Sequence, residues 1–209
     1  MPGIGSIPDR RIVRVGANLV GAVGAALFAR AGLEHFRSTH SLIGAGLFAV
    51  QMWIVVAYLI RRPALVVSQR TRDWLLAFGG TFAGVLYRPT GAHPGWGVVS
   101  GFALQSVGLI ICVVAFLSLG RSFGFAAADR GLKSHGAYAV VRHPIYASYL
   151  PLQLGYVMQS LSVRNVLVMC LVFFCDIGRL LAEERLLLTS TTYDAYRTHV
   201  RWRLVPGLW

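Results

Sequence analysis

The sequence predicts an all-α fold: a polytopic transmembrane helical bundle of about six spans (five to six). Of its 209 residues, 56% are hydrophobic and 13% are charged, whereas a soluble domain usually carries about 25% charged residues. The apolar residues fall in five or six long runs, which one soluble core would not need. Arginines cluster at the ends of these runs, as is typical of helices that cross a bilayer.

The first two apolar runs cover about residues 12–31 and 42–60. Gly16, Gly21 and Gly24 give the first run a small-residue face, which lets membrane helices approach closely. Arginines precede this run, as in a signal peptide, but the run is long and no clear small-residue cleavage site follows. We therefore interpret it as the first span.

The third run, about 74–87, is short for a full span. We expect it to tilt, to thin the bilayer locally or to lie partly at the interface. A Pro- and Gly-rich turn separates it from the fourth run, about 97–119, which is long enough to cross a membrane.

A helical hairpin follows a polar segment of residues 120–143. Its first arm begins at Pro144 and ends near Leu161, and its second arm covers about 166–182. From Glu183 onward the chain is a polar and aromatic tail. The polar segment and the tail flank the hairpin, so we expect both on one face of the membrane.

The net charge of +12 is distributed unevenly between the two predicted sides. The excess favours a protein of the cell inner membrane with both termini in the cytoplasm. No basic soluble module with interleaved aromatic residues is visible, so we expect no nucleic-acid partner. The cytoplasmic side would hold Arg10, Arg11, Arg14, Arg61, Arg62, Arg70, Arg72, Arg121, Arg130, Lys133 and Arg142, and the opposite loops Arg30, Arg37, Arg88 and Arg164.

The cysteines and histidines do not indicate a metal site. Cys112, Cys170 and Cys175 lie inside apolar runs, and their odd number and the lack of a CxxC motif argue against a disulfide framework or a zinc site. The six histidines show no HExxH spacing. We therefore predict no metal.

The first polar cluster surrounds Arg142, His143 and Pro144. Proline suits the first position of a helix and disfavours helical geometry at the residue before it. Arg142 and His143 would then lie at a helix N-terminus, which attracts anions, and Arg142 could bind a carboxylate with two hydrogen bonds. Alternatively, Arg142 is a loop residue that sets topology and His143 a solvated cap.

The second cluster places Asp176, Arg179 and Glu183 on one helical face. Asp176 and Arg179 could neutralise each other and pin two helices together. Glu183 and Glu184 are adjacent and point about 100° apart on a helix. At most one of them can pair with Arg179, which leaves the other free for a ligand or solvent.

The third cluster is the aromatic tail. Trp202 and Trp209, together with arginines, suit an anchor at the membrane interface. Tyr193 and Tyr196 could instead form the wall of a pocket, since aromatic faces stabilise cationic ligands such as a sulfonium.

These clusters, in this order, resemble the isoprenylcysteine carboxyl methyltransferase family and its bacterial relatives. The resemblance covers about ninety residues, whereas the first 118 match only as apolar spans. Two departures are Gly136-Ala137-Tyr138, where the family often has Gly-Pro-Tyr, and Thr191-Thr192, where it usually has Phe-Gly. The matching segments are LGRSFG (119–124), ADRGLKSHGAYAVVRHPIY (128–146), RLLAEERLL (179–187), YDAY (193–196) and RWRLVPGLW (201–209).

The resemblance implies S-adenosyl-L-methionine as cofactor, bound at the cytoplasmic end of the hairpin beneath the tail. It divides the chain into N-terminal transmembrane helices, 1–119, and a catalytic half that binds the cofactor, 120–209. We expect Arg142 and Glu184 to act on the methyl acceptor. The expected cofactor-binding residues are Tyr138, His143, Pro144, Tyr146, Glu183, Glu184, Tyr193 and Tyr196.

The expected reaction is methyl transfer to a lipophilic or small acceptor, such as an isoprenylcysteine-type carboxylate. A carboxylate is ionised at neutral pH and needs no strong base, whereas a thiol, amine or hydroxyl would make Glu184 or a tyrosine a candidate base. One alternative is an NADPH-dependent membrane reductase of the sterol-reductase type, which shares a similar RHPxY hairpin. Another is a non-catalytic scaffold or transporter subunit, although the paired broken helices of many transporters are not evident. The oligomeric state stays open.

Overall fold

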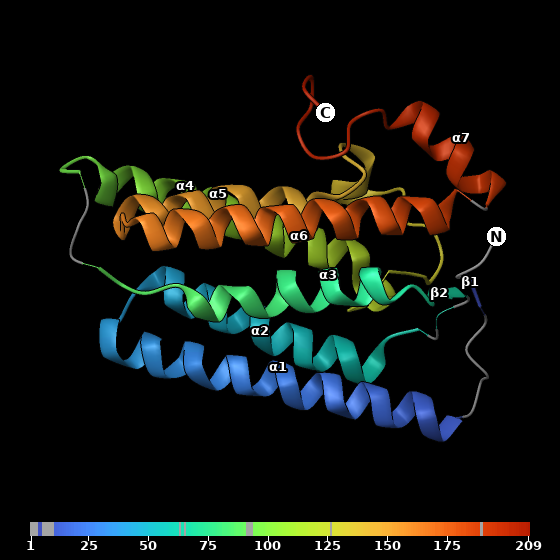
Figure 1. Cartoon of the computed structure of the whole chain (residues 1–209), viewed down its shortest axis with the longest axis horizontal. Helices are drawn as coiled ribbons and strands as arrows, with labels where there is room; N and C mark the ends of the chain where they lie inside the picture. Colours follow the sequence, from blue (N-terminus) through green and yellow to red (C-terminus); the bar gives the residue numbers. More distant parts are fainter. Residues whose placement is uncertain are drawn as a thin grey trace.

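The computed structural model describes residues 4–5, 11–62, 64, 66–90, 94–125, 127–188 and 190–209. It is mostly helical, with 74% of residues in helices and 3% in strands. Helices α1 to α6 run up and down beside one another, and α7 lies across one end (Figure 1). Their bounds are α1 Arg11–Thr39, α2 Leu42–Ile60, α3 Thr71–Phe82, α4 Gly97–Leu119, α5 Pro144–Gln159, α6 Val163–Leu187 and α7 Thr191–His199.

Three of the described helices are long and apolar enough to cross a membrane. They are α2, α4 with its 3-10 extension Gly97–Ser122, and α6, with mean hydropathies of 2.1, 2.4 and 1.9. The structure is thus that of a helical membrane protein, while the number of about six spans stays a prediction. Helices α3 and α5 have only 12 and 16 residues, and α3 continues in a 3-10 turn, Ala83–Leu86.

Helix α1 continues eight residues beyond the predicted end of the first apolar run, as far as Thr39. A pair of opposite charges spans the predicted end of the run: the side chains of Arg30 and Glu34 lie 2.9 Å apart at i,i+4 spacing. Such pairs stabilise helices. The polar stretch that suggested a loop is therefore a helical extension, and it ends before His40, whose φ is 50°.

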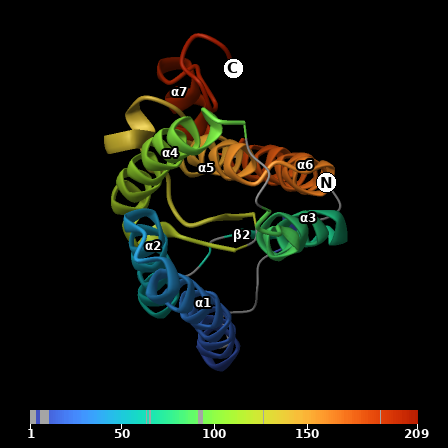
Figure 2. The same ribbon diagram turned by 90° about the vertical axis from the view of Figure 1, so that its left-hand side faces the viewer.

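The helices pack most extensively as three pairs: α1 with α2, α4 with α5, and α3 with α6. Figure 2 shows α1 and α2 on one side of the bundle, α4, α5 and α6 on the other, and α3 beside α6. Glycines allow the close contacts. A Cβ at Gly21 would overlap the ring of Tyr58, and one at Gly155 would lie 2.5 Å from the carbonyl oxygen of Gly101.

A small antiparallel sheet departs from the all-α prediction. Its strands are β1 (Ile4–Gly5), β2 (Val66–Ser68) and β3 (Ala128–Asp129), with β2 in the centre. Val67 is opposite Gly5 on one side and Ala128 on the other. Strands of two or three residues are too short to show alternation in the sequence. The sheet fastens the polar segment before α5 to the α2–α3 connection.

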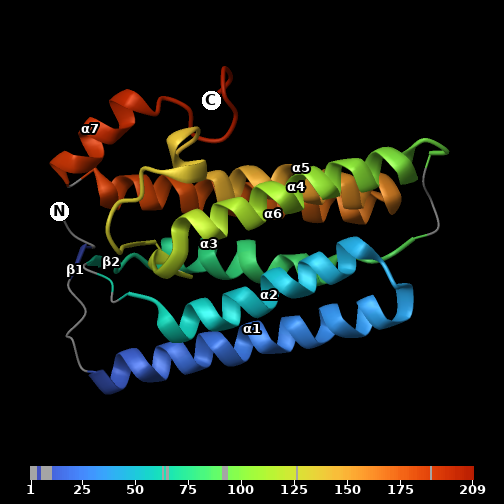
Figure 3. The same ribbon diagram turned by 180° about the vertical axis from the view of Figure 1, so that it is seen from behind.

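The start of α1, the sheet and α7 lie at one end of the bundle, and the C-terminal tail folds back from α7 along its outer side (Figures 1 and 3). The polar segment 120–143 and the tail therefore meet, as the sequence predicts. Arg10, which contributed to the predicted orientation, lies outside the described residues.

Candidate functional site

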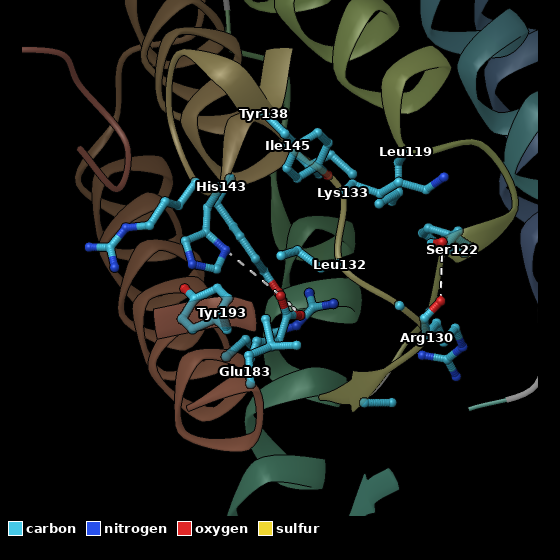
Figure 4. Close-up of a pocket in the computed structure, with 18 of the residues that line it drawn as sticks. Leu119, Ser122, Arg130, Leu132, Lys133, Tyr138, His143, Ile145, Glu183 and Tyr193 are labelled. Carbon is cyan, nitrogen blue, oxygen red and sulfur yellow. Dashed lines mark hydrogen bonds and ion pairs between the residues drawn. The ribbon is translucent and has the colours of Figure 1, made fainter. Parts of the chain in front are cut away.

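A cavity of about 140 Å³ lies at this end of the bundle, between the polar segment, the hairpin and α7. Figure 4 shows Arg130 and Ser122 on one side of it and His143 and Tyr193 on the other. Seven of the predicted site residues line it: the catalytic candidate Arg142 and six of the expected cofactor-binding residues, Tyr138, His143, Tyr146, Glu183, Tyr193 and Tyr196. Pro144 and Glu184 are not among the lining residues.

Helix α6 continues to Leu187, so the C-terminal tail proper follows α7 and covers residues 200–209. The backbone of this tail holds the start of α5 in place. The N–H groups of Arg142 and His143 donate to the carbonyls of Trp202 and Arg203, each at 2.9 Å. Pro144, fully buried, is the first residue of α5 and lacks an N–H. The expected helix start at Pro144 is confirmed, and Pro144 shapes the site without facing the cavity.

Glu184 is buried next to the residues that line the cavity, with only 5% of its surface exposed, and its carboxylate makes several polar contacts. Its Oε1 accepts from Arg142 Nη1 at 3.0 Å and from the Tyr193 hydroxyl at 3.1 Å. His143 Nε2 lies 3.4 Å from the same oxygen, and Arg203 Nε donates to Oε2 at 2.9 Å. The sequence predicts that Glu184 acts on the methyl acceptor, but four protein groups surround this carboxylate, which favours a positioning role.

Glu183 is the carboxylate that faces the cavity among the described lining residues. Its side chain is 26% exposed, and Oε1 accepts a 2.6 Å hydrogen bond from the Tyr146 hydroxyl. Oε2 lies 3.9 Å from His143 Nδ1. The buried His143 ring therefore lies between the two adjacent glutamates, with one ring nitrogen toward each.

Tyrosines form much of the cavity wall. Tyr138, Tyr146, Tyr193 and Tyr196 were expected there, and Tyr149 joins them. Tyr149 follows Tyr146 by three residues on α5, so their helical spacing could have indicated it. The Tyr196 hydroxyl donates to the carbonyl of Tyr138 at 2.6 Å, which ties α7 to the segment before α5.

Burial makes these phenols poor bases. It raises the pKa of Tyr196 to about 12 and also raises the pKa of Tyr138 and Tyr193. Each phenol thus keeps its proton at neutral pH. These tyrosines can donate hydrogen bonds or present an aromatic face, but they do not provide the general base that a neutral acceptor would need.

Asp176 and Arg179 form the pair that the sequence suggested, with Arg179 Nη1 3.4 Å from Asp176 Oδ1. Arg179 also donates to the carbonyl of Phe125 at 3.0 Å, and its guanidinium lies 5.5 Å from the ring centre of Tyr146. The pair thus connects α6 with the polar segment and with α5.

Trp202 and Trp209 lie outside the cavity lining, each 38% exposed. The Arg203 guanidinium lies 5.1 Å from the ring centre of Trp209, so this tryptophan packs on the tail itself. Within the described ranges, no three His, Cys, Asp or Glu side chains gather as a possible metal site.

Comparison with known proteins leaves the family open. No protein-family model matches the chain, and no curated protein is significantly similar to it. The functional argument therefore rests on the cavity and on the motifs that line it.

Proposed function

We propose that the protein is an integral membrane S-adenosyl-L-methionine-dependent methyltransferase that acts on a lipophilic or small acceptor. The observation that carries this proposal is the cavity at one end of the bundle, where one partly exposed carboxylate, Glu183, stands among tyrosines. A carboxylate suits the amino group or ribose hydroxyls of the cofactor. Aromatic faces suit its positively charged sulfonium.

The cavity is small for the proposed cofactor. Pockets for drug-sized ligands usually measure about 300–1,000 Å³, and this cavity encloses about 140 Å³. The residues therefore fit the cofactor chemically, but its binding requires the polar segment or α7 to move outward. We propose such an opening as part of binding.

We assign the cavity-facing groups of His143, Tyr146 and Glu183 to cofactor binding, with Tyr138, Tyr193 and Tyr196 as walls. Arg142 lines the cavity but its charge is paired with Glu184, so we assign both residues, with Pro144, to positioning. When bound, the cofactor supplies an activated methyl group. The chain contributes alignment and the exclusion of water, which are the main requirements of an in-line methyl transfer.

Calorimetry with S-adenosyl-L-methionine tests the proposal on the full chain in detergent. We expect saturable binding that Glu183→Gln weakens by about tenfold, because the substitution removes the charge that faces the ligand. Glu34→Gln, at an exposed position on α1, should bind like the wild type. A well-folded wild-type protein that does not bind the cofactor would overturn the proposal.

NADPH separates the alternatives. A thermal shift with NADPH, and none with S-adenosyl-L-methionine, would favour a membrane reductase. A protein stabilised by neither compound would favour a scaffold or transporter subunit.

A further inference from the structure

Arg130 is a cavity-lining arginine without an ionic partner among the described residues. Its Nε atom is buried and has no hydrogen-bond partner there. Burying an unpaired charge is costly. The carboxylate next to it in sequence, Asp129, accepts the N–H of Gly131 at 2.8 Å and so closes its own turn.

The charges around the cavity do not balance. The lining contains the cations Arg130, Lys133, Arg142 and Arg179. Arg142 is paired with Glu184 and Arg179 with Asp176, whereas neither Arg130 nor Lys133 forms an ion pair with a described carboxylate. Glu183 is the carboxylate among the lining residues that could offset Arg130 and Lys133, and it also interacts with His143 and Tyr146.

The position of Arg130 is well defined by its neighbours. The Ser122 hydroxyl donates to its carbonyl at 3.3 Å. A Cβ at Gly124 would overlap its guanidinium, so the missing side chain at 124 leaves the space that the guanidinium occupies. Burial, and then the like charge of Arg61, lower the pKa of Arg130 to about 10. It therefore stays protonated at neutral pH.

Arg61 does not relieve this positive charge. It donates to Asn18 Oδ1 at 2.6 Å, and its guanidinium lies 5.0 Å from the ring centre of Tyr58. Arg61 thus has neutral partners and adds a second cation near Arg130. A negatively charged ligand group at this side of the cavity would be stabilised by both.

We propose that Arg130 binds the negatively charged group of the methyl acceptor and so selects anionic acceptors over amines and neutral alcohols. This inference rests on the proposed methyl transfer. S-adenosyl-L-methionine carries a sulfonium and an ammonium against one carboxylate and is itself a net cation. It cannot balance a cavity that already has excess positive charge, whereas an anionic second ligand can.

An anionic acceptor also needs no general base, and neither the buried tyrosines nor Glu184 provide one. A lone pair of the anion forms the new bond to the methyl carbon, the bond from that carbon to sulfur breaks, and its electron pair stays on sulfur as a neutral thioether. The acceptor loses its negative charge and the sulfonium its positive charge. No proton has to be removed, in keeping with tyrosines that keep theirs and a Glu184 that is fully engaged.

The test uses the full chain in a neutral detergent, saturated with S-adenosylhomocysteine and titrated with decanoate, decanol and decylamine. We expect decanoate to bind about tenfold more tightly than decanol, and decylamine more weakly than both. Arg130→Gln should abolish the preference for decanoate, and Arg130→Lys should keep part of it. Arg72→Gln, which removes the same charge from an exposed position on α3, should leave it unchanged. Acetate as a further probe tells whether a soluble anion suffices or an apolar chain is needed.

Gly124→Ala provides a second variant in case Arg130→Gln does not fold. It keeps the charge but displaces the guanidinium, and we expect it to reduce the preference for decanoate severalfold. An unchanged preference in both Arg130→Gln and Gly124→Ala would overturn the inference.

The result also separates this inference from the proposed function. Cofactor binding that persists in a protein without any anion preference would leave the methyltransferase intact and refute the role of Arg130. If Arg130→Gln weakened the cofactor and not decanoate, Arg130 would hold the cofactor carboxylate, and the inference would be wrong. A third outcome would refute both proposals: NADPH binds more tightly than decanoate, and Arg130→Gln abolishes that binding. Arg130 would then bind a phosphate group of a nucleotide cofactor.

Discussion

Glu183 and Glu184 show how two adjacent residues of one type take different roles. They point about 100° apart on α6, so Glu184 faces Arg142, Arg203 and the tail, whereas Glu183 faces the cavity. The surroundings of each carboxylate follow from that difference. Glu184 stabilises the contact between the start of α5 and the C-terminal tail, and Glu183 is available to a ligand.

Glu184→Gln should therefore destabilise the protein far more than Glu183→Gln. The substitution leaves the buried Arg142 and the half-buried Arg203 without their carboxylate, and breaking a buried ion pair typically costs about 3 kcal/mol. Urea unfolding in detergent, followed by circular dichroism, measures the difference. Equal losses of stability in the two variants would contradict these roles.

At the residue scale, the sequence predicted the members of the site better than their roles. Arg142, His143 and Tyr146 of the RHPxY motif and the tyrosines of α7 line the cavity, whereas Pro144 does not. Which glutamate faces the cavity depends on the rotation of α6 and on Arg203, nineteen residues further along. Arg130 gave no local signal, because its importance depends on partners that the fold places elsewhere.

At the level of elements, the α4–α5 contact depends on glycines. A Cβ on Gly155 would lie 2.5 Å from the carbonyl oxygen of Gly101 and 3.0 Å from the backbone nitrogen of Gln105. Neither backbone atom can move without moving α4. These two helices carry the cavity at one end, so their spacing determines the position of Pro144 and its neighbours.

Gly155→Ala should thus lower stability by about 1–3 kcal/mol, the usual cost of overpacking. Gly24→Ala on α1 is the matched control. No described atom lies within 4 Å of its added Cβ, and alanine favours a helix by up to about 1 kcal/mol over glycine. Thermal unfolding of both variants checks the prediction, which fails if Gly155→Ala unfolds at or above the wild-type temperature.

A second contact between elements fastens α3 to α6. Asp73, 2% exposed, accepts hydrogen bonds from Arg185 of α6 and from Ser68 of β2. Trp74 Nε1 donates to the carbonyl of Ser68 at 2.9 Å. The sheet and the end of α6 are therefore connected through one carboxylate.

Asp73→Asn should loosen this end of the bundle. It removes the charge that opposes Arg185, and we expect a loss of about 1–3 kcal/mol, since Arg185 is partly exposed and can be solvated. Limited proteolysis of the α2–α3 connection, residues 61–70, provides the readout. Cleavage at the wild-type rate would show that the contact does not hold α3 in place.

For the whole molecule, the apolar runs predicted the helices well because most of these runs are long. The ends of the helices and the short strands were predicted less well. An i,i+4 ion pair carried α1 through a polar stretch, and strands of two or three residues depend on pairing between distant segments. Only three described helices meet the length and hydropathy of a span, so the number of crossings requires an experiment.

Labelling of introduced cysteines can decide the topology. His135 precedes α5 at the cavity end, and Trp96 lies at the other end of α4, both exposed. We expect a membrane-impermeant maleimide added to intact cells to label Trp96→Cys and not His135→Cys, because the excess of arginines predicts that the cavity end is in the cytoplasm. Cells opened by detergent should label both. The reverse pattern in intact cells would refute the orientation.

The tail that holds the start of α5 beside the cavity also provides a way to follow motion at the site. The amide protons of Arg142 and His143 are held by the carbonyls of Trp202 and Arg203, and such protons exchange with solvent deuterium only when that contact opens. Their exchange rate in the ligand-free protein therefore reports how often the tail lifts. Saturation with S-adenosyl-L-methionine should slow it, and an unchanged rate would show that ligands enter by another route. The exchange rates of the amide protons of Arg142 and His143 would thus measure how often the site opens to solvent.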